Sequence, residues 1–212
     1  MKQFDFFLMF GALGVGKTTV GSILKDDKRY EYDFYELDAI ISKKVKKPIS
    51  EYFNEIGMYK FYDVSLMQIE RLFQIRENLG FNAPNSPAKP MIIDVGSGSI
   101  YDYRAKELLS KYNSIVLTAD PEYLFNTRNK AQDIYKELGY YKTWQFGNEK
   151  QEIYSSCDIN VDVSYLDAKQ VAEIIHCKLK NFMDIKISER NDKHILENFD
   201  EIEKCQKESE GK

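Results

Sequence analysis

The sequence predicts an α/β fold in which a five-stranded parallel sheet carries helices on both of its faces. Strand-like and helix-like segments alternate along most of the 212 residues, which is typical of parallel strands joined by crossover helices. A glycine-rich loop at residues 11–18 joins the first strand to the first helix. Because crossover helices cover the faces of a parallel sheet, we expect three layers, helix on sheet on helix.

The first part of the chain predicts two strands and several helices. In chain order these are a strand at Phe4–Phe10, a helix at Thr18–Asp26, a strand at Tyr32–Asp38, and helices at Ala39–Lys46 and Ser50–Leu79. The first run is nearly all apolar and aromatic, as in a strand covered on both faces. The second strand ends in the acidic residues Glu36 and Asp38. In the last helical stretch we expect a capped start at Ser50 and a break near Gly57.

The second part predicts three more strands. In chain order we expect a loop at Phe81–Pro90, a strand at Met91–Val95, a helix at Tyr103–Tyr112, a strand at Ser114–Ala119, a helix from Asp120 to about Leu138, a strand at Ile159–Val163 and a helix at Leu166–Phe182. Asp120 before Pro121 is a helix start, with aspartate as the N-cap and proline at the first helical position. Parallel strands end at one edge of a sheet, so the glycine loop, Asp38 and Asp94 are expected together there.

Composition narrows the classes of function. Hydrophobic residues make up 43% of the chain and charged residues 30%, as in ordinary globular proteins. A net charge of −4 gives no electrostatic case for nucleic acid, and no apolar run is long enough for a membrane span. The chain enters a strand at once, so we expect no signal peptide. Cys157, Cys177 and Cys205 lack metal-ligand spacing and are expected as reduced thiols of a cytoplasmic protein.

The glycine-rich loop is the strongest functional signal. Gly11–Thr18 matches G-x-x-x-x-G-K-[ST] at every fixed position. The glycines let backbone N–H groups converge on phosphate oxygens, and the helix N-terminus adds positive potential. Lys17 is expected to reach the β- and γ-phosphates of ATP, and the Thr18 hydroxyl to bind Mg²⁺. The predicted nucleotide-binding residues are Gly11, Ala12, Leu13, Gly14, Val15, Gly16, Lys17, Thr18 and Thr19.

Three carboxylates are candidates for the remaining chemistry. Glu36 and Asp38 lie two apart on the expected strand, so their side chains would share a face. Asp38 could orient an acceptor hydroxyl or take its proton, and Glu36 could hold a metal-bound water. Asp94 follows an apolar run, as in a Mg²⁺-binding aspartate, but it could instead cap the Gly96–Gly98 turn. That turn, Gly96-Ser97-Gly98, would let backbone N–H groups approach a substrate closely.

Phosphoryl transfer also needs a cation near the transferring group. Arg128 on the helix after the fourth strand is the first candidate, followed by Lys130, Lys142 and Lys150. Arg128 could equally be a solvated surface charge, and an isolated lysine of this kind is more often one. Together the motifs predict an ATP-dependent phosphotransferase in which Lys17, Asp38 and Arg128 are the catalytic residues.

From Phe6 to about Ile175 the chain resembles the shikimate kinase family. The matching segments are the phosphate loop Gly11–Thr18, the Asp-x-Asp strand end at Tyr35–Asp38 with Glu36 in place of the first Asp, the substrate-binding segment Lys47–Phe53 with Gly57 and Phe61, the glycine turn Gly96–Gly98, the helix carrying Arg104 and Leu108, and Arg128 near the nucleotide. The resemblance implies the three-layer P-loop kinase sandwich, the cofactors ATP and Mg²⁺, and transfer of the γ-phosphate to a hydroxyl of a small acceptor such as shikimate.

The acceptor half of the site departs from the family. Tyr62 stands where the family has an arginine that grips the acceptor's carboxylate, and Ser65 replaces the glutamate that supports it. Lys150 replaces a second such arginine, and the lid sequence Arg-Pro-Leu-Leu is absent. The expected acceptor residues are Asp38, Phe61, Tyr62, Gly96, Ser97, Gly98 and Lys150. Because tyrosine does not replace a forked guanidinium, a sugar acid, cyclitol or nucleotide acceptor stays open, as does a catalytically silent nucleotide-binding regulatory protein.

The expected organisation is a kinase domain at 1–183 and a charged C-terminal helix or tail at 184–212. Within the domain we expect an acceptor-binding helical insertion at about 39–80 and a lid at about 128–150. Ile195, Phe199 and Ile202 in the tail have helical spacing. We expect a monomer or weak homodimer whose partner is a small hydroxylated acceptor, with no nucleic-acid or membrane partner.

Overall fold

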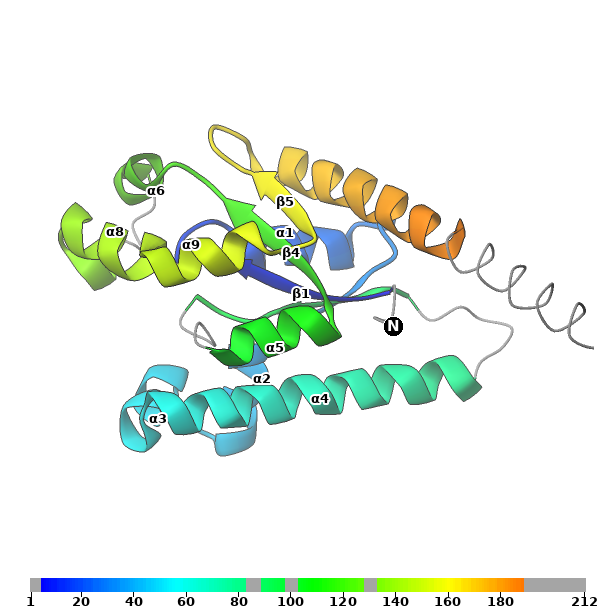
Figure 1. Cartoon of the computed structure of the whole chain (residues 1–212), viewed down its shortest axis with the longest axis horizontal. Helices are drawn as coiled ribbons and strands as arrows, with labels where there is room; N and C mark the ends of the chain where they lie inside the picture. The colour runs from blue at the N-terminus through cyan, green and yellow to red at the C-terminus, as the bar shows by residue number, and fades with distance from the viewer. Residues whose placement is uncertain (1–4, 83–88, 98–102, 128–132, 189–212) are drawn as a thin grey trace, which may run out of the picture. The chain divides into compact units, whose positions relative to one another are not determined.

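A computed structural model of the chain describes residues 5–82, 89–97, 103–127 and 133–188. Its sheet has five strands in the order β2-β3-β1-β4-β5, and all neighbouring pairs run parallel (Figure 1). The strands are β1 (Phe6–Gly11), β2 (Asp33–Glu36), β3 (Met91–Asp94), β4 (Asn113–Thr118) and β5 (Ile159–Asp162). β1 is central and all of its residues are buried, which explains its apolar sequence. The predicted fold class is confirmed.

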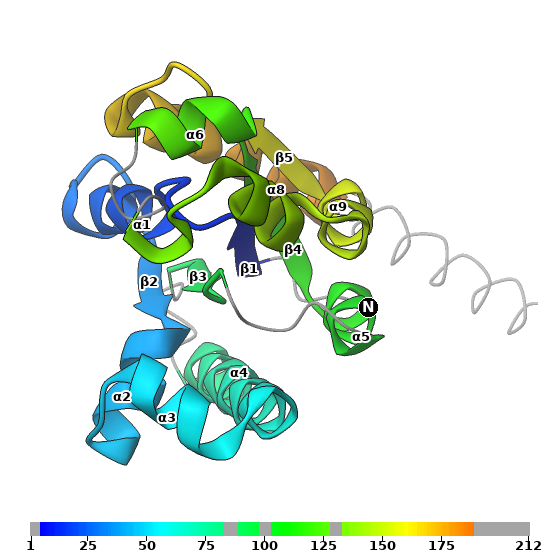
Figure 2. The same ribbon diagram turned by 90° about the vertical axis from the view of Figure 1, so that its left-hand side faces the viewer.

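Helices cover both faces of this sheet. They are α1 (Lys17–Asp26), α2 (Leu37–Val45), α3 (Ile49–Ile56), α4 (Met58–Asn82), α5 (Tyr103–Lys111), α6 (Pro121–Thr127), α8 (Leu138–Phe146) and α9 (Asn148–Ser155). Residues 133–135 and 168–176 are also helical. α1 lies on one face of the sheet, and α4 and α5 lie on the other (Figures 1 and 2).

The chain divides into two compact units, Met1–His176 and Cys177–Lys212. The sheet and the helices named above belong to the first unit. In the second unit, residues 177–188 are helical, and 189–212 lie outside the described residues. The predicted domain limits, including the boundary at 183, stay predictions.

Three aromatic rings fix α4 against the sheet. Phe6 on β1 packs against Phe73 on α4 with ring centroids 5.1 Å apart, and Tyr112 lies 5.0 Å from Phe73. Each such contact contributes about 0.5–1.5 kcal/mol beyond the burial of apolar area.

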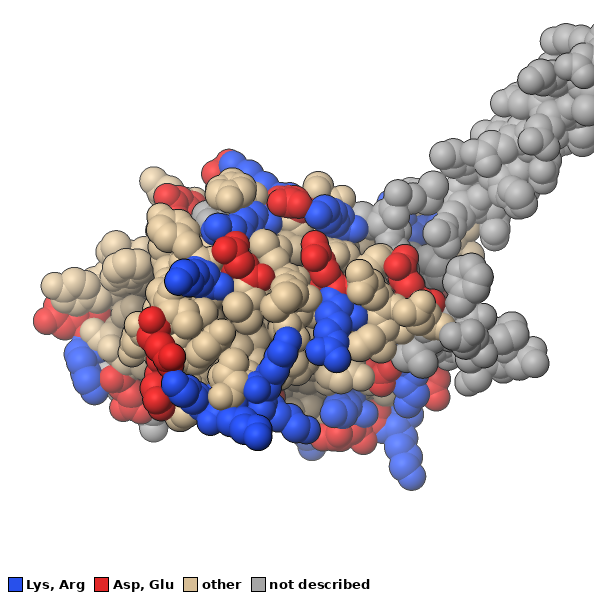
Figure 3. Space-filling view, turned by 90° about the horizontal axis from the view of Figure 1, so that it is seen from below, with Lys and Arg blue, Asp and Glu red and all other residues tan. Residues whose placement is uncertain are grey.

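The outer face that carries α4 shows acidic and basic side chains interspersed (Figure 3). Within the described residues no helix is long and apolar enough to cross a membrane.

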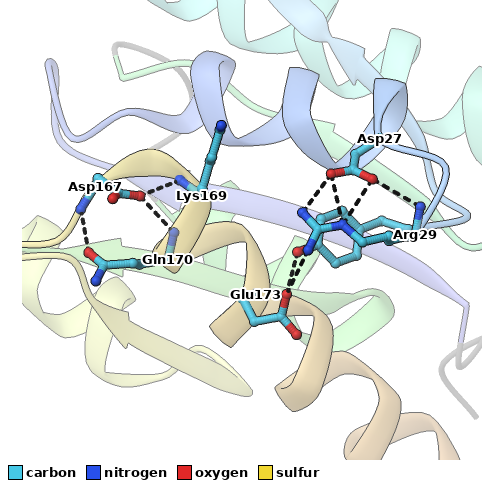
Figure 4. Close-up of polar contacts among 7 residues, drawn as sticks. Asp27, Arg29, Asp167, Lys169, Gln170 and Glu173 are labelled. Atoms are coloured by element: carbon cyan, nitrogen blue, oxygen red, sulfur yellow. Dashed lines mark hydrogen bonds and ion pairs between the residues drawn. The ribbon is translucent and has the colours of Figure 1, made fainter.

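A polar network ties the segment after α1 to helix 168–176 (Figure 4). The Arg29 guanidinium donates to both carboxylate oxygens of Asp27 and lies 3.8 Å from Glu173. This hydrogen bonding lowers the pKa of Asp27 to about 2. Asp167 and Gln170 form a reciprocal capping box at the start of the helix, because the side chain of each accepts the backbone N–H of the other.

The second strand ends earlier than predicted. β2 ends at Glu36, and Asp38 lies in the first turn of α2. The prediction that Glu36 and Asp38 share a face of one strand is therefore wrong. The helix begins at Leu37, whose side chain is fully buried, and an acidic residue in the first turn is favoured by the helix dipole.

The long helical stretch breaks where predicted but starts differently. Gly57, with φ 78°, ends α3 through its N–H bond to the Phe53 carbonyl, and α4 begins at the next residue. α3 starts at Ile49 after Pro48, and no side chain caps it. The predicted Ser50 cap is wrong because the fixed φ of Pro48 already sets the entry into the helix.

The segment after β4 contains more helices than predicted. Asp120 caps α6 as expected, because its Oδ1 accepts the Tyr123 N–H at 2.7 Å. The predicted continuation to Leu138 is wrong, because Lys136 has φ 59°, which no α-helix accommodates. α8 and α9 follow, where no further helix was predicted; the expected lid at about 128–150 includes α8 and only the start of α9.

Candidate active site

One cleft collects most of the predicted site residues at the carboxyl edge of the sheet. It has a volume of about 560 Å³. Its lining residues are Leu13, Gly14, Gly16, Lys17, Thr18, Thr19, Glu36, Asp38, Ile49, Asp94, Gly96, Ser97 and Thr127. We call it the phosphate cleft. Ile49 and Thr127 were not predicted, whereas Asp38 reaches the cleft because the first turn of α2 directly follows β2.

The glycine loop has the backbone that its sequence requires. Gly11 has φ 146°, and a Cβ there would lie 2.7 Å from the Leu117 carbonyl oxygen, so only glycine fits. Gly16, with φ 101°, turns the chain into α1. Lys17 is buried, and its Nζ donates to the carbonyls of Gly11 at 2.9 Å and Ala12 at 3.3 Å. The ammonium group is therefore held within the curve of the loop.

Thr18, Glu36 and Asp94 form an oxygen cluster beside the loop. Thr18 Oγ1 lies 3.0 Å from Glu36 Oε2 and 3.3 Å from Asp94 Oδ2. Among the described residues, no group of three or more His, Cys, Asp or Glu side chains could hold a metal ion. One hydroxyl and two carboxylates still fit Mg²⁺, which is usually bound through one or two carboxylates, with waters and substrate phosphates completing its shell.

Asp94 uses its two oxygens differently. Oδ1 accepts the Gly96 N–H at 2.8 Å, and Gly96 has φ 78°. Oδ2 faces Thr18. The turn-capping role is therefore present, and the same side chain keeps its second oxygen for the predicted metal site.

The Asp94→Asn variant separates these two roles. Asparagine keeps an oxygen that accepts the Gly96 N–H but removes the carboxylate charge. We expect the Mg²⁺ concentration for half-maximal phosphoryl transfer to rise at least about 10–100-fold, the range for loss of a group that only orients metal ligands. Magnesium titrations of the transfer rate measure this, and the urea unfolding midpoint should stay near that of the unchanged protein. An unchanged magnesium dependence would mean that Asp94 caps the Gly96 turn and does not bind the metal.

A second, aromatic-walled pocket of about 680 Å³ lies between α3–α4 and α8–α9. We call it the aromatic pocket; it is lined by Phe53, Met58, Tyr59, Tyr62, Tyr135, Thr143, Trp144, Gln145, Gly147, Asn148, Glu149 and Lys150. Tyr62 and Lys150, predicted for the acceptor, both line it. Lys150 Nζ donates to the Ser97 carbonyl at 3.0 Å, and Ser97 lines the phosphate cleft. Lys150 thus connects the two sites.

The environment of Lys150 opposes its positive charge. Burial lowers the pKa of its ammonium group to about 7, and the nearby charge of Lys17 acts in the same direction. Near neutral pH this side chain is therefore charged in only part of the molecules.

A guanidinium group lies beside Tyr62, the position where the resemblance had predicted an arginine to be missing. Arg104 on α5 has its Cζ 5.8 Å from the Tyr62 ring, 5.9 Å from the Tyr59 ring and 5.0 Å from the Tyr103 ring. It also pairs with Asp63 at 3.3 Å. Cations are attracted to ring faces at such distances. From the sequence, Arg104 was expected only as part of a helix motif.

Some predicted residues lie elsewhere. Phe61 packs in the core against Phe53, with ring centroids 5.3 Å apart, and is not among the lining residues of either pocket. Ala12 is buried in the loop, and its carbonyl serves Lys17. Gly98 and Arg128 lie outside the described residues, as does Lys130. Thr127, directly before Arg128, lines the phosphate cleft.

A third cleft, of about 440 Å³, adjoins the phosphate loop. It shares Gly16 and Thr19 with the phosphate cleft and is also lined by Val15. Tyr123 and Tyr165 stand in its wall with ring centroids 4.6 Å apart. Three predicted nucleotide-binding residues therefore meet an aromatic pair that the sequence did not reveal.

Two side chains of α8 that contact the loop were not predicted from the sequence. Gln145 Oε1 accepts the Leu13 N–H at 2.9 Å, and the Tyr141 hydroxyl donates to the Leu13 carbonyl at 2.7 Å. No local motif marks these residues, because their partner is a backbone unit more than a hundred positions away.

Comparison with known proteins gives a consistent result. The family model described as shikimate kinase matches residues 13–180. The shikimate kinase of Thermodesulfovibrio yellowstonii is 24% identical over 172 residues, which cover 79% of this chain and 91% of that protein. A shikimate kinase of Streptococcus suis is 24% identical over 178 residues, which cover 81% and 98%.

Solved structures show the same fold. The shikimate kinase of Aquifex aeolicus superposes with a TM-score of 0.58 at 21% identity, covering 83% of this chain and 96% of that one. The Acinetobacter baumannii shikimate kinase, solved in complex with shikimate, gives a TM-score of 0.57 at 18% identity, covering 84% and 94%.

Proposed function

The chain belongs to the shikimate kinase family, and we propose that it phosphorylates a hydroxyl of a small anionic acceptor, with shikimate as the first candidate. As a family member it is an ATP-dependent phosphotransferase. One observation carries the proposal for the site: Lys17, Thr18, Asp38 and Asp94 line a single cleft at the carboxyl edge of the sheet.

Each of these residues has a distinct role in the proposal. Lys17 binds and orients the terminal phosphates. Thr18, Glu36 and Asp94 hold Mg²⁺, which when bound offsets negative charge on the phosphates. Asp38 orients the acceptor hydroxyl and takes its proton. Gly96 and Ser97 bring the backbone close to the acceptor.

The rest of ATP is assigned to the third cleft, and the rest of the acceptor is assigned to the side of the aromatic pocket. The nucleoside lies in the third cleft, which shares Gly16 and Thr19 with the phosphate cleft and offers the Tyr123–Tyr165 pair for stacking. Arg128 stays proposed for the nucleotide phosphates. The acceptor's anionic group faces Lys150, where the phosphate cleft and the aromatic pocket meet.

A screen of acceptors tests the proposal. ADP release with Mg²⁺-ATP is measured for shikimate and for a panel of sugar acids, cyclitols and nucleotides. Turnover with shikimate supports the first candidate, and turnover with another compound assigns a different acceptor to the same site. Nucleotide binding without turnover on any compound would favour the silent regulatory protein. A cytoplasmic location and a monomer or weak homodimer stay predictions.

The charge of Lys150 gives the acceptor step a pH dependence. A lysine with a pKa near 7 attracts an anion below that pH and loses the attraction above it. We therefore expect kcat/KM for an anionic acceptor to fall about tenfold as the pH rises through 7, because kcat/KM for the acceptor reports the enzyme form that has not yet bound it. Rates at saturating Mg²⁺-ATP from pH 6 to 9 measure this.

Two variants show whether Lys150 causes the fall. Lys150→Arg keeps its charge over the whole range, so its profile should be flat. Lys150→Met should be weak at every pH and equally flat. If Lys150→Arg shows the same fall as the unchanged protein, another group titrates.

A further inference from the structure

Two side chains of α8 bind both polar backbone atoms of one residue in the phosphate loop. Leu13 lies between Gly11 and Gly16; its N–H goes to Gln145 at 2.9 Å and its carbonyl accepts from Tyr141 at 2.7 Å. Tyr141 and Gln145 are four residues apart and so face the same side of the helix. The two residues are 0% and 3% exposed, respectively. We call this pair the α8 clamp.

The clamp is itself held in place. The Tyr141 ring packs against Phe125, Tyr135 and Phe146, with centroids 5.4–5.7 Å apart. Gln145 Nε2 donates to the Tyr135 hydroxyl at 2.5 Å, which leaves Oε1 directed at Leu13. Burial raises the pKa of the Tyr141 hydroxyl, so it stays a donor at ordinary pH. Both side chains therefore have fixed orientations.

The loop needs such support because glycines give its backbone freedom. A phosphate-binding loop is effective only when its N–H groups already point at the phosphates, and small displacements cost large factors in rate. Lys17 bonds the carbonyls of Gly11 and Ala12 from inside the curve of the loop. The α8 clamp holds the next residue, Leu13. It also commits the Leu13 N–H to Gln145, which leaves phosphate contacts to the loop amides that follow.

We propose that Tyr141 and Gln145 are positioning residues that hold the phosphate loop in its nucleotide-binding shape. In this role they act through Leu13 and make no contact with the nucleotide. The proposal uses the proposed function only in that the nucleotide binds at this loop. The helix that the sequence suggested as a lid is, by this inference, a fixed support of the loop.

Single-group deletions test the clamp. Tyr141→Phe removes only the hydroxyl, and Gln145→Leu removes only the amide. We expect each to weaken Mg²⁺-ADP binding about tenfold by titration calorimetry, because a buried loop group loses its partner. The double variant should lose less than the product of the two factors, since both residues hold one backbone unit. Tyr140→Phe on the same helix, where Tyr140 is 61% exposed, is the matched control and should bind normally.

Hydrogen exchange separates positioning from general stability. In Gln145→Leu the Leu13 amide should exchange at least about tenfold faster, whereas amides of the central β1 strand stay protected. Tyr135→Phe, which frees the Gln145 amide without touching Leu13, should show a smaller change in the same direction.

Normal ADP affinity in Tyr141→Phe and Gln145→Leu, with only a lower urea midpoint, would overturn the proposal. If the unchanged protein bound no nucleotide, the proposed function would fail, and the Leu13 exchange would still decide whether the clamp orders the loop.

Discussion

Replacing Lys17 with alanine is expected to abolish measurable phosphoryl transfer. The Lys17 ammonium is buried inside the loop and is the charge nearest to where the terminal phosphates are proposed to lie. Removing one electrostatic contact to a transition state costs about 10²–10³-fold in kcat, and here ground-state binding of the phosphates is lost as well. Coupled assays of ADP release at saturating acceptor measure the loss.

The control for this variant lies on the same helix. Lys25→Ala removes an exposed lysine from the last turn of α1 and should leave turnover unchanged. Because Lys17 also satisfies the carbonyls of Gly11 and Ala12, the urea midpoint of Lys17→Ala is measured too. A folded Lys17→Ala protein with near-normal transfer would remove this loop from the active site.

The parts of the fold that the sequence predicted well are those with strong local signals. β1 is a buried apolar run, the glycine loop has a fixed motif, and Gly57 and Asp120 mark helix ends by their own chemistry. Asp38 was placed on the wrong element because a four-residue strand passes directly into a helix. It still reaches the phosphate cleft, since the end of a strand and the first turn after it lie at the same edge of the sheet.

The parts that could not be predicted depend on distant contacts. α8 and α9 are short, and much of what holds them is contact with segments far away in the chain. Tyr141 and Gln145 bind a backbone unit 128 and 132 positions away. Arg104 lies beside Tyr62 because α5 and α4 meet in space, and the spacing of the two residues in the sequence does not show this. Side-chain spacing in one sequence carries no trace of such pairs.

Asp38→Asn is expected to lower kcat about 10²–10⁴-fold while nucleotide affinity stays nearly unchanged. Asparagine has the same shape, so the first turn of α2 and the cleft should be kept. It cannot take the proton of the acceptor hydroxyl, which is the role proposed for Asp38. Because that role belongs to the transition state, kcat and kcat/KM for the acceptor should fall together.

Three measurements make the Asp38 test decisive. Calorimetry with Mg²⁺-ADP should give the affinity of the unchanged protein, since Asp38 lies on the acceptor side of the proposed site. Asp33→Asn, at the opposite end of β2, should keep full activity because it changes the same residue type away from the cleft. Asp38→Ala should be as slow as Asp38→Asn if proton transfer is what is lost.

An unchanged kcat in Asp38→Asn would move the role to Asp94, whose second oxygen faces the same cleft. A loss confined to KM would instead make Asp38 a binding residue for the acceptor.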